Sequence, residues 1–264
     1  MYERSGRNLH SINTISNNKI KEIVKLHQKK YRDEKGLFIA EGEKALQEAL
    51  NSTLEIIEIY ALKTFDTSKI TKEVCIVDEN IMKKISTTDS VCEVLFIAKK
   101  IEIDKKEFTN LKKIALLDSI SDPGNLGTII RSATAFGVNG IILFGNCVDL
   151  YSPKVIRSCT GNFLKIPIIS MKNIDELKSL FKNHKLIATA LSEKNNISLK
   201  ECAKIEKYII MLGSEAKGLC SELIALADNN IRIDMANNVE SLNLSVCASI
   251  IFYELFKNIN FCNN

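Results

Sequence analysis

Three short stretches carry polar side chains that could do chemistry. The first is residues 118–127, Asp-Ser-Ile-Ser-Asp-Pro-Gly-Asn-Leu-Gly, and a helical pattern that contains Arg131 follows it at once. The start of a helix offers free N–H groups and the positive end of its dipole, which suit an anion. Arg131 adds five donors in a rigid fork, which could clamp a phosphate or a developing alkoxide. The alternative is an ordinary strand-to-helix turn with a solvated Arg131. The glycines do not form the GxGxxG spacing of a dinucleotide site.

The second stretch, residues 209–219, places Glu215 between Gly213 and Gly218 directly after an apolar run. Glycine lets the backbone come close to a ligand, and a glutamate at such a position is not a core residue. Backbone contacts of this kind suit an adenine or a methionine moiety. The alternative is a surface turn with a solvated Glu215.

The third stretch, residues 231–245, leads into an apolar helix whose start is crowded by Ser241, Asn243 and Ser245. Short polar side chains cap the free N–H groups of helix N-termini, and capping alone accounts for one of the three. With Glu240 beside them, three such residues indicate polar groups that face a ligand. Capping remains the alternative interpretation.

A mostly parallel sheet is predicted to position these stretches. Apolar runs typical of buried parallel strands occur at 114–117, 140–144, 186–191, 208–212 and 231–233. Helical patterns fall between or after them at 126–136, 153–160, 174–183, 221–227 and 242–257. Helices would therefore cover both faces of the sheet, and such sheets bind ligands outside the carboxyl ends of their strands.

The part of the chain before the sheet has the pattern of a smaller α/β unit. Helices are predicted at 17–28, 43–50 and 79–85, and strands at 36–42, 56–61, 74–77 and 94–98. Residues 99–113 are charge-rich with weak periodicity, as in a linker. We therefore expect two domains, residues 1–105 and residues 106–264.

Composition is that of an ordinary globular protein, with 45% hydrophobic and 26% charged residues among 264. The net charge is +4, whereas the first 35 residues alone carry nine basic and four acidic side chains. The eight cysteines form no CxxC pair, which favours reduced thiols and no metal site. Without an apolar leader or a run of about 18 apolar residues, a cytoplasmic location without membrane contact is expected.

Taken together and in this order, the three stretches closely resemble the three motifs of the SpoU/TrmH family of RNA methyltransferases, within the SPOUT superfamily. The matching strings are Asn125-Leu-Gly-Thr-Ile-Ile-Arg131-Ser-Ala, Leu212-Gly-Ser-Glu215-Ala-Lys-Gly218-Leu219 and Glu240-Ser-Leu-Asn243-Leu-Ser. The match extends to Ser152–Arg157 and covers most of residues 114–256. Residues 18–21 and 38–42 with the helix after them resemble the family's substrate-binding domain, which has a ribosomal-protein L30e-like fold.

The resemblance implies a fold that the residues alone do not. Periodicity predicts a plain doubly wound sheet, because knots are very rare. Resemblance to the family instead implies a C-terminal, mostly parallel sheet with helices on both faces and a deep trefoil knot, beside the smaller N-terminal α/β domain. It also implies a homodimer formed through the C-terminal domain, with the cofactor pocket completed by the second subunit.

The cofactor implied by the resemblance is S-adenosyl-L-methionine, held in a bent form among the knot loops. Its contacts fall on Ala190, Leu191, Leu212, Gly213, Gly218, Ile233, Met235 and Leu242. The family's catalytic positions fall on Asn125, Arg131, Glu215, Ser241 and Asn243. One departure is Asp234, where the family usually has proline, and a carboxylate there either alters the adenine loop or is tolerated on its exposed side.

The expected activity is methylation of a ribose 2′-hydroxyl in RNA, with ribosomal RNA favoured over transfer RNA because of the N-terminal domain. Candidate RNA contacts are the basic residues Lys19, Lys21, Lys25, Lys29, Lys30, Arg32 and Arg157. Arg131 either acts as the base or stabilises the forming alkoxide, and Glu215 would orient Arg131 or the ribose. The competing hypotheses are a transfer-RNA 2′-O-methyltransferase and a non-catalytic RNA- or ribosome-binding protein of the same fold.

Overall fold

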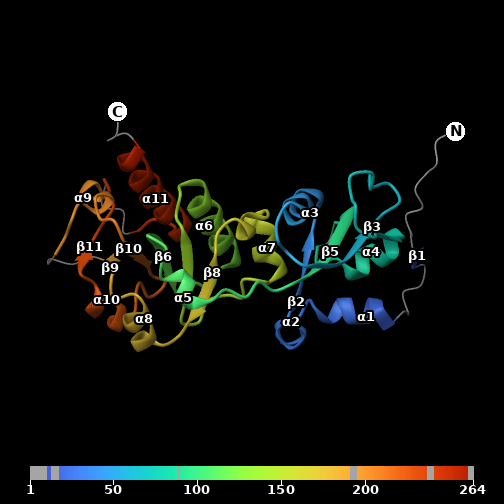
Figure 1. Ribbon diagram of the computed structural model, residues 1–264, viewed down its shortest axis with the longest axis horizontal. Helices are drawn as coiled ribbons and strands as arrows, with labels where there is room; N and C mark the ends of the chain where they lie inside the picture. The colour runs from blue at the N-terminus through green and yellow to red at the C-terminus, as the bar shows by residue number, and fades with distance from the viewer. Residues whose placement is uncertain (1–10, 13–17, 89, 191–194, 237–240, 261–264) are drawn as a thin grey trace. The chain divides into compact units, whose positions relative to one another are not determined.

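The computed structural model describes residues 11–12, 18–88, 90–190, 195–236 and 241–260 (Figure 1). Contacts between residues divide the chain into two compact units. The first unit is Met1–Ile101 together with Asp149–Leu164, and the second is Glu102–Val148 together with Lys165–Asn264. A boundary at residue 105 would leave residues 149–164 in the second domain, whereas their contacts place them in the first unit.

The first unit is built on a five-stranded mixed sheet in the order β1-β4-β3-β5-β2. Its strands are β1 (Ser11–Ile12), β2 (Leu37–Glu41), β3 (Ile56–Ala61), β4 (Cys75–Val77) and β5 (Val94–Lys99). Its helices are α1 (Asn18–Lys25), α2 (Lys29–Lys35), α3 (Glu43–Leu50), α4 (Glu79–Ile85) and α7 (Pro153–Cys159), followed by the 3₁₀ turn η1 (Asn162–Leu164). Ile20, Ile23 and Ile81 are buried in the core that joins α1 and α4 to one face of the sheet.

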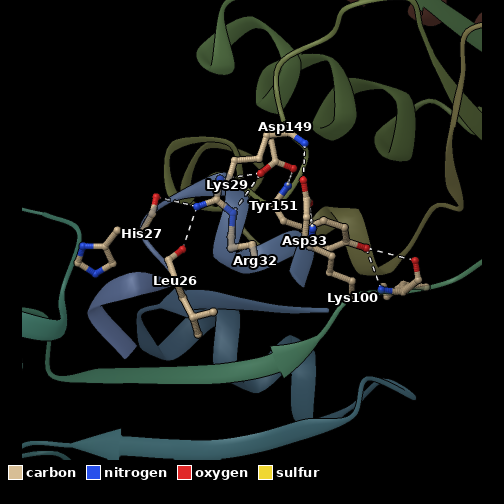
Figure 2. A network of polar contacts seen from close by, with 9 residues as sticks. Leu26, His27, Lys29, Arg32, Asp33, Lys100, Asp149 and Tyr151 are labelled. Atoms are coloured by element: carbon tan, nitrogen blue, oxygen red, sulfur yellow. Dashed lines mark hydrogen bonds and ion pairs between the residues drawn. The ribbon is translucent and has the colours of Figure 1, made fainter. Parts of the chain in front are cut away.

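Residues 149–164 belong to this unit because aromatic rings and an ion pair hold them there. Tyr151 and Phe163 both pack against Phe38 of β2, with ring centroids 4.8 and 5.7 Å away. Arg32 of α2 binds Asp149 through Nε at 3.1 Å and Nη2 at 2.6 Å (Figure 2). A methyltransferase-motif match at Ser152–Arg157 could not show this packing, since it depends on side chains more than a hundred residues away in the sequence.

The Arg32 guanidinium also closes the turn between α1 and α2. Its Nη1 donates to the carbonyl oxygens of Leu26 at 2.9 Å and of His27 at 2.7 Å, and only 3% of the residue is exposed (Figure 2). Nearby, Asp33 accepts from Lys100 and Lys29, and these two hydrogen bonds lower the pKa of Asp33 to about 2. A buried guanidinium is stable only when it is paired and hydrogen-bonded, so this network fixes where α2 lies.

The second unit contains a six-stranded, entirely parallel sheet within the described residues, in the order β11-β9-β10-β6-β7-β8. Its strands are β6 (Lys113–Asp118), β7 (Gly140–Phe144), β8 (Ile168–Met171), β9 (Lys185–Ala188), β10 (Tyr208–Leu212) and β11 (Asn229–Asn230). Every residue of β7 and β10 is buried. Strands covered on both faces need such continuous apolar sequences, which confirms the predicted α/β class.

Helices cover both faces of this sheet, as Figure 1 shows. They are α5 (Lys105–Phe108), α6 (Pro123–Ala135), α8 (Ile174–Leu180), α9 (Leu199–Ala203), α10 (Ser221–Leu226) and α11 (Leu244–Asn260). Phe108, Leu177 and Leu223 of α5, α8 and α10 share one core, while α6 and α9 both pack against α11. The deep trefoil knot implied by the family resemblance stays a prediction.

The structure differs from the predicted elements at several places. β1, α2, β8 and α9 were not predicted, because each is too short to show a clear period. The expected linker contains α5, whose Phe108 is 1% exposed. The last strand of the sheet is Asn229–Asn230 rather than residues 231–233, because Ile231 donates the final bond to β9 and the chain then leaves the sheet.

His184 is a buried imidazole at the end of the sheet that carries β9. Its Nε2 donates to the carbonyl oxygen of Leu111 at 2.6 Å, and its Nδ1 has no hydrogen-bond partner in the described part of the chain. Protonation would place an unpaired N–H and a charge in a buried site, near Lys207. Burial therefore lowers the pKa of His184, an effect that the bond to Leu111 partly opposes.

This lowered pKa predicts a pH dependence of stability. The unfolded chain binds a proton at His184 below about pH 6.5 while the folded chain does not, so stability should fall as the pH drops below 6.5. His184→Gln, whose amide can replace the bond to Leu111 without titrating, should flatten this decline. Urea midpoints by circular dichroism at pH 7.5, 6.5 and 5.5 test this, and equal slopes for the two proteins would contradict it.

Candidate active site

The carboxyl ends of four neighbouring strands, β11, β9, β10 and β6, converge on one edge of the second unit. Leu212, the last residue of β10, lies opposite Leu117 of β6, so the loops that follow the two strands start side by side. Residues 189–190 follow β9 and residues 231–235 follow β11 at the same edge. Three stretches that are far apart in the sequence are therefore brought together by strand pairing.

The loop after β10 folds back on itself at the two glycines. Ser214 and Gly218 exchange backbone hydrogen bonds of 3.1 and 2.8 Å, and Gly218 has a φ of +65°. A Cβ on Gly213 would lie 2.0 Å from the carbonyl carbon of Gly218, so no side chain fits at position 213. The loop is held at its far end by the buried Asp118 of β6, which accepts from the backbone N–H of Cys220 at 2.8 Å. This tight loop presents Glu215.

Glu215, Asn125 and Asn243 form one hydrogen-bonded cluster. Oε1 of Glu215 accepts from Nδ2 of Asn125 and from Nδ2 of Asn243, both at 2.8 Å. Nδ2 of Asn243 also donates to Oδ1 of Asn125 at 3.1 Å. Each residue comes from a different one of the three stretches, so the cluster joins the start of α6, the loop after β10 and the start of α11.

Both asparagines are placed by helix capping. Asp122 caps α6 by accepting from the backbone N–H of Asn125 at 2.7 Å, which fixes that residue in the first turn. Asn243 caps α11, since its Oδ1 accepts from the N–H of Ser245 at 3.0 Å and from the Ser245 hydroxyl at 2.7 Å. One amide thus caps a helix with its oxygen and binds Glu215 with its nitrogen. The capping interpretation of this stretch is confirmed for Asn243, whereas its role in binding a ligand stays a prediction.

A cavity of about 340 Å³ opens beside the cluster. Its lining comes from the loops after β9, β10 and β11 and from the first turns of α11. The lining residues are Thr189, Ala190, Leu212, Gly213, Ser214, Glu215, Gly218, Ile231, Arg232, Ile233, Met235, Ser241, Leu242, Leu244, Cys247 and Ile251. The volume falls within the range of small-molecule sites, and the surface is mostly apolar with a few polar groups, as such sites usually are.

The structure brings nearly all of the expected cofactor residues around this cavity. Seven of them line it, namely Ala190, Leu212, Gly213, Gly218, Ile233, Met235 and Leu242. Leu191 lies outside the described residues. Of the expected catalytic residues, Glu215 and Ser241 line the cavity. Asn125 and Asn243 do not line it but are hydrogen-bonded to Glu215.

Several cavity residues were not predicted from the sequence. Cys247 and Ile251 follow Asn243 at intervals of four residues, which places them on the same side of α11. That spacing could have indicated them. Thr189, whose hydroxyl donates to the Met211 carbonyl oxygen at 2.9 Å, carried no signal in the sequence, where it falls within the predicted strand 186–191 although β9 ends at Ala188.

Asp234, the departure from the family pattern, is exposed and does not line the cavity. Its carboxylate binds Nε of Arg232 at 3.0 Å. Of the two expectations for this residue, the geometry favours a carboxylate tolerated on the exposed side. Arg232, by contrast, lines the cavity at its mouth.

Arg131 lies apart from the cluster and is not among the residues that line the cavity. It is exposed on α6 and makes no hydrogen bond or ion pair within the described part of the chain. Six residues of helix separate it from Asn125, a rise of about 9 Å. Its guanidinium is therefore free to bind a group supplied from outside the unit.

The expected RNA contacts divide into six exposed side chains and one buried one. Lys19, Lys21, Lys25, Lys29, Lys30 and Arg157 are exposed. The expectation for Arg32 is wrong, because four of its five N–H groups are used inside the first unit. Its place in a basic run of sequence suggested an RNA contact, whereas the fold turns it inward onto Asp149.

Among the described residues, no group of three or more His, Cys, Asp or Glu side chains is arranged to hold a metal ion. No helix in these residues is both long enough and apolar enough to cross a membrane.

Comparison with protein-family models gives two matches. Residues 112–253 match the SpoU rRNA Methylase family, and residues 17–95 match the MRM3-like substrate binding domain. A similar curated protein is the 23S rRNA (guanosine(2553)-2′-O)-methyltransferase RlmP of Bacillus subtilis, 30% identical over 92% of this chain and 98% of its own length.

Solved structures agree with this assignment. The AdoMet-bound rRNA methyltransferase from Sinorhizobium meliloti superposes with a TM-score of 0.85 at 28% identity, over 96% of this chain and 99% of that one. The SpoU methyltransferase AviRb from Streptomyces viridochromogenes shares the fold, with a TM-score of 0.82 at 21% identity over 91% of this chain and 97% of that one. The chain therefore belongs to the SpoU rRNA methylase family and carries an MRM3-like substrate-binding domain at its N-terminal side.

Proposed function

We propose that this protein transfers a methyl group from S-adenosylmethionine to a ribose 2′-hydroxyl of ribosomal RNA. The observation that carries the proposal is the cluster of Glu215, Asn125 and Asn243 at the mouth of a cavity that the expected cofactor residues line. The Bacillus subtilis relative is named a 23S rRNA 2′-O-methyltransferase, which favours ribosomal over transfer RNA. A cytoplasmic location is part of this proposal. An intact cluster supports an enzyme over a non-catalytic binder.

The cavity fits the proposed cofactor in size and in chemistry. Leu212, Ile233 and Leu242 provide apolar surface for an adenine ring, and the backbone near Gly213 is open to close approach because no side chain covers it. When bound, S-adenosylmethionine supplies a methyl group made electrophilic by the positive charge on its sulfur. The residues of the chain need only to place that methyl group and the acceptor oxygen in line, about 3 to 3.5 Å apart.

Glu215 positions the groups around the reacting oxygen. Because Oε1 already accepts three N–H groups, from Asn125, Asn243 and the backbone of Leu244, it holds the three loops in one geometry. Oε2 stays available to accept a hydrogen bond from the substrate ribose. Ser241, exposed on the cavity wall, is placed to contact the same nucleotide.

Arg131 is assigned to the 2′-hydroxyl itself. A guanidinium keeps its protons at the pH values at which enzymes work, so it is a poor base. As a fixed cation it lowers the energy of the alkoxide as the hydroxyl loses its proton, and an RNA phosphate would orient it. Its freedom from contacts within the unit fits a role that begins only when RNA binds.

A second copy of the chain is proposed to pack against α11. Val246, Tyr253 and Phe256 are 46%, 46% and 39% exposed, and with Ile250 they form an apolar stripe along the helix. Phe136 at the end of α6 extends this stripe, because its ring centroid lies 5.5 Å from that of Tyr253. A stripe of this kind suits a two-fold helix pair in which each copy covers the other. Arg131, on α6, then lies beside the interface.

The reaction is tested by incubating the protein with labelled S-adenosylmethionine and total RNA from a strain that lacks the gene. Alkali-resistant 2′-O-methyl positions are then mapped. We expect one new site in ribosomal RNA. Labelling of transfer RNA instead would contradict the substrate, and cofactor binding without methylation of any RNA would favour the non-catalytic binder.

Arg131→Ala should lower methyl transfer at least a hundredfold, the effect of removing one preorganised donor to a developing oxyanion. Binding of S-adenosylmethionine, measured by calorimetry, should stay within about threefold of wild type, because Arg131 does not line the cavity. Thr128→Ala, one turn earlier on the exposed side of α6, is the matched control. A large loss of cofactor affinity in Arg131→Ala would overturn this division of roles.

Tyr253→Glu should convert the dimer into a monomer, because each two-fold contact would bury two unpaired carboxylates. Ile224→Glu on α10 changes an isoleucine of similar exposure, 43%, away from the stripe and should leave the dimer intact. Sedimentation velocity at micromolar concentration distinguishes the two states. A wild-type protein that sediments as a monomer would refute the proposed interface.

A further inference from the structure

A second cavity, of about 530 Å³, lies within the first unit and takes no part in the site described above. It is a groove bordered by α1 and α2 and by strands β2, β3 and β5. Ile23, Leu26 and Ile97, each nearly fully buried, form its apolar floor. Its volume lies within the range of small-molecule binding sites, so it can accept a ligand of that size.

The wall formed by β3 contains a structural irregularity. Ile56 lies opposite Ala98 and Glu58 opposite Ile97, so Ile57 is an extra residue without a partner on β5. Such a bulge redirects a side chain, and Ile57 lines the groove with 42% of its surface exposed. Ile57 thus offers apolar surface in the groove, and its burial by a ligand would be favourable.

α2 contributes Tyr31 to the lining of the groove, next to a residue whose contacts hold the helix in place. Tyr31 precedes Arg32, whose guanidinium binds Asp149 and the carbonyl oxygens of Leu26 and His27 (Figure 2). Nζ of Lys25 lies 5.7 Å from the centre of the Tyr31 ring. The groove thus has an aromatic ring with a cation beside it.

The rim of the groove carries charges of both signs. Lys19, Lys25 and Lys35 provide positive charge, and Glu22, Glu34 and Glu58 provide negative charge. Glu58 is paired with Lys19 at 2.8 Å. Three carboxylates would repel the continuous phosphate backbone of a duplex. Glu58 is also bound by the Tyr60 hydroxyl, which leaves Glu22 and Glu34 for a ligand. These two suit the edge of a base, because carboxylates accept from exocyclic amino groups while lysines contact the flanking phosphates.

We propose that this groove binds an unpaired nucleobase of the RNA substrate, stacked between Tyr31 and Ile57, with Lys19, Lys25 and Lys35 against the adjoining phosphates. The proposal rests on the proposed function, since it assumes an RNA substrate. It assigns the first unit a specific task, which is to recognise a single-stranded position of the RNA rather than a helix. Unstacked bases held on aromatic rings are the usual basis of such recognition.

The test uses fluorescein-labelled octamers of adenylate and cytidylate, and an eight-base-pair RNA duplex, in fluorescence anisotropy with the full chain. Tyr31→Ala should raise the Kd for the single-stranded octamers about tenfold, the loss of one base–aromatic stack. Ile57→Ser should also raise the Kd for the single-stranded octamers. Kd for the duplex should change less than twofold in both variants.

Two variants control for folding and for surface effects. Tyr31→Phe retains the ring and should bind like wild type, while Val91→Ala, which removes an apolar side chain of similar exposure to Ile57 elsewhere in the unit, should change nothing. Absence of octamer binding by the wild-type protein would overturn the proposal. So would equal losses for octamer and duplex, or an equal loss in Val91→Ala.

A photo-crosslinking amino acid at position 57 asks whether the occupant is RNA or protein. Adducts with RNA support the proposal, and adducts restricted to protein overturn it in favour of a peptide site. Methyl transfer and S-adenosylmethionine binding separate this proposal from the proposed function. If the wild-type protein methylates RNA but Tyr31→Ala loses no affinity, only the groove proposal fails; if no methyl transfer occurs, octamer binding still decides it.

Discussion

Parallel pairing of β6, β10, β9 and β11 is the constraint on which the candidate active site depends. In a parallel sheet the carboxyl ends of neighbouring strands meet at one edge, so the loops after these strands must share a small volume. The strand register determines where these loops start, because the last residue of β10 lies opposite Leu117 of β6. The cavity and the polar cluster are consequences of that shared edge.

Within this edge, one carboxylate oxygen joins the loops. Glu215 accepts from Asn125 at the start of α6 and from Asn243 at the start of α11, and each asparagine is in turn held by the capping of its helix. The capping contacts at the two helix N-termini therefore also fix contacts between segments that are distant in sequence. The loop that carries Glu215 can make its tight return only because Gly213 has no side chain.

α11 connects the site to the proposed interface. It begins at Leu244 beside the cavity and continues for 17 residues, about 25 Å of helix. One side of it, with Cys247 and Ile251, faces the cavity, and another carries the exposed apolar stripe. Association of two copies would therefore hold in place the same helix whose first residues bind Glu215.

The first unit depends on a different interaction, the buried pair of Arg32 and Asp149. It joins α2 to a segment that follows the first part of the sheet domain in sequence, and it orients the turn between α1 and α2. The groove beside Tyr31 owes its shape to this turn. An ion pair between residues more than a hundred positions apart in the sequence thus determines the shape of this groove.

The sequence by itself determined the α/β class, most strands of the parallel sheet and the three stretches that form the site. It could do so because fully buried strands require continuous apolar runs, and because capping residues and glycines mark the ends of elements. Residues such as Asn243 were identifiable from their own neighbourhood. The family resemblance added the cofactor positions, since no spacing in one chain specifies an adenine pocket.

Only the tertiary structure decided which side chains face inward and which remain free. Arg32 and Lys30 are two residues apart in a basic run, yet one is buried and the other exposed, because Asp149 comes within reach of only one of them. The bulge at Ile57 and the place of residues 149–164 were equally hidden, since both depend on strand register and on contacts distant in sequence. The spacing of apolar residues in the sequence indicates whether a segment is a helix or a strand. Whether a particular charged side chain is buried depends on which residues from the rest of the chain pack against it.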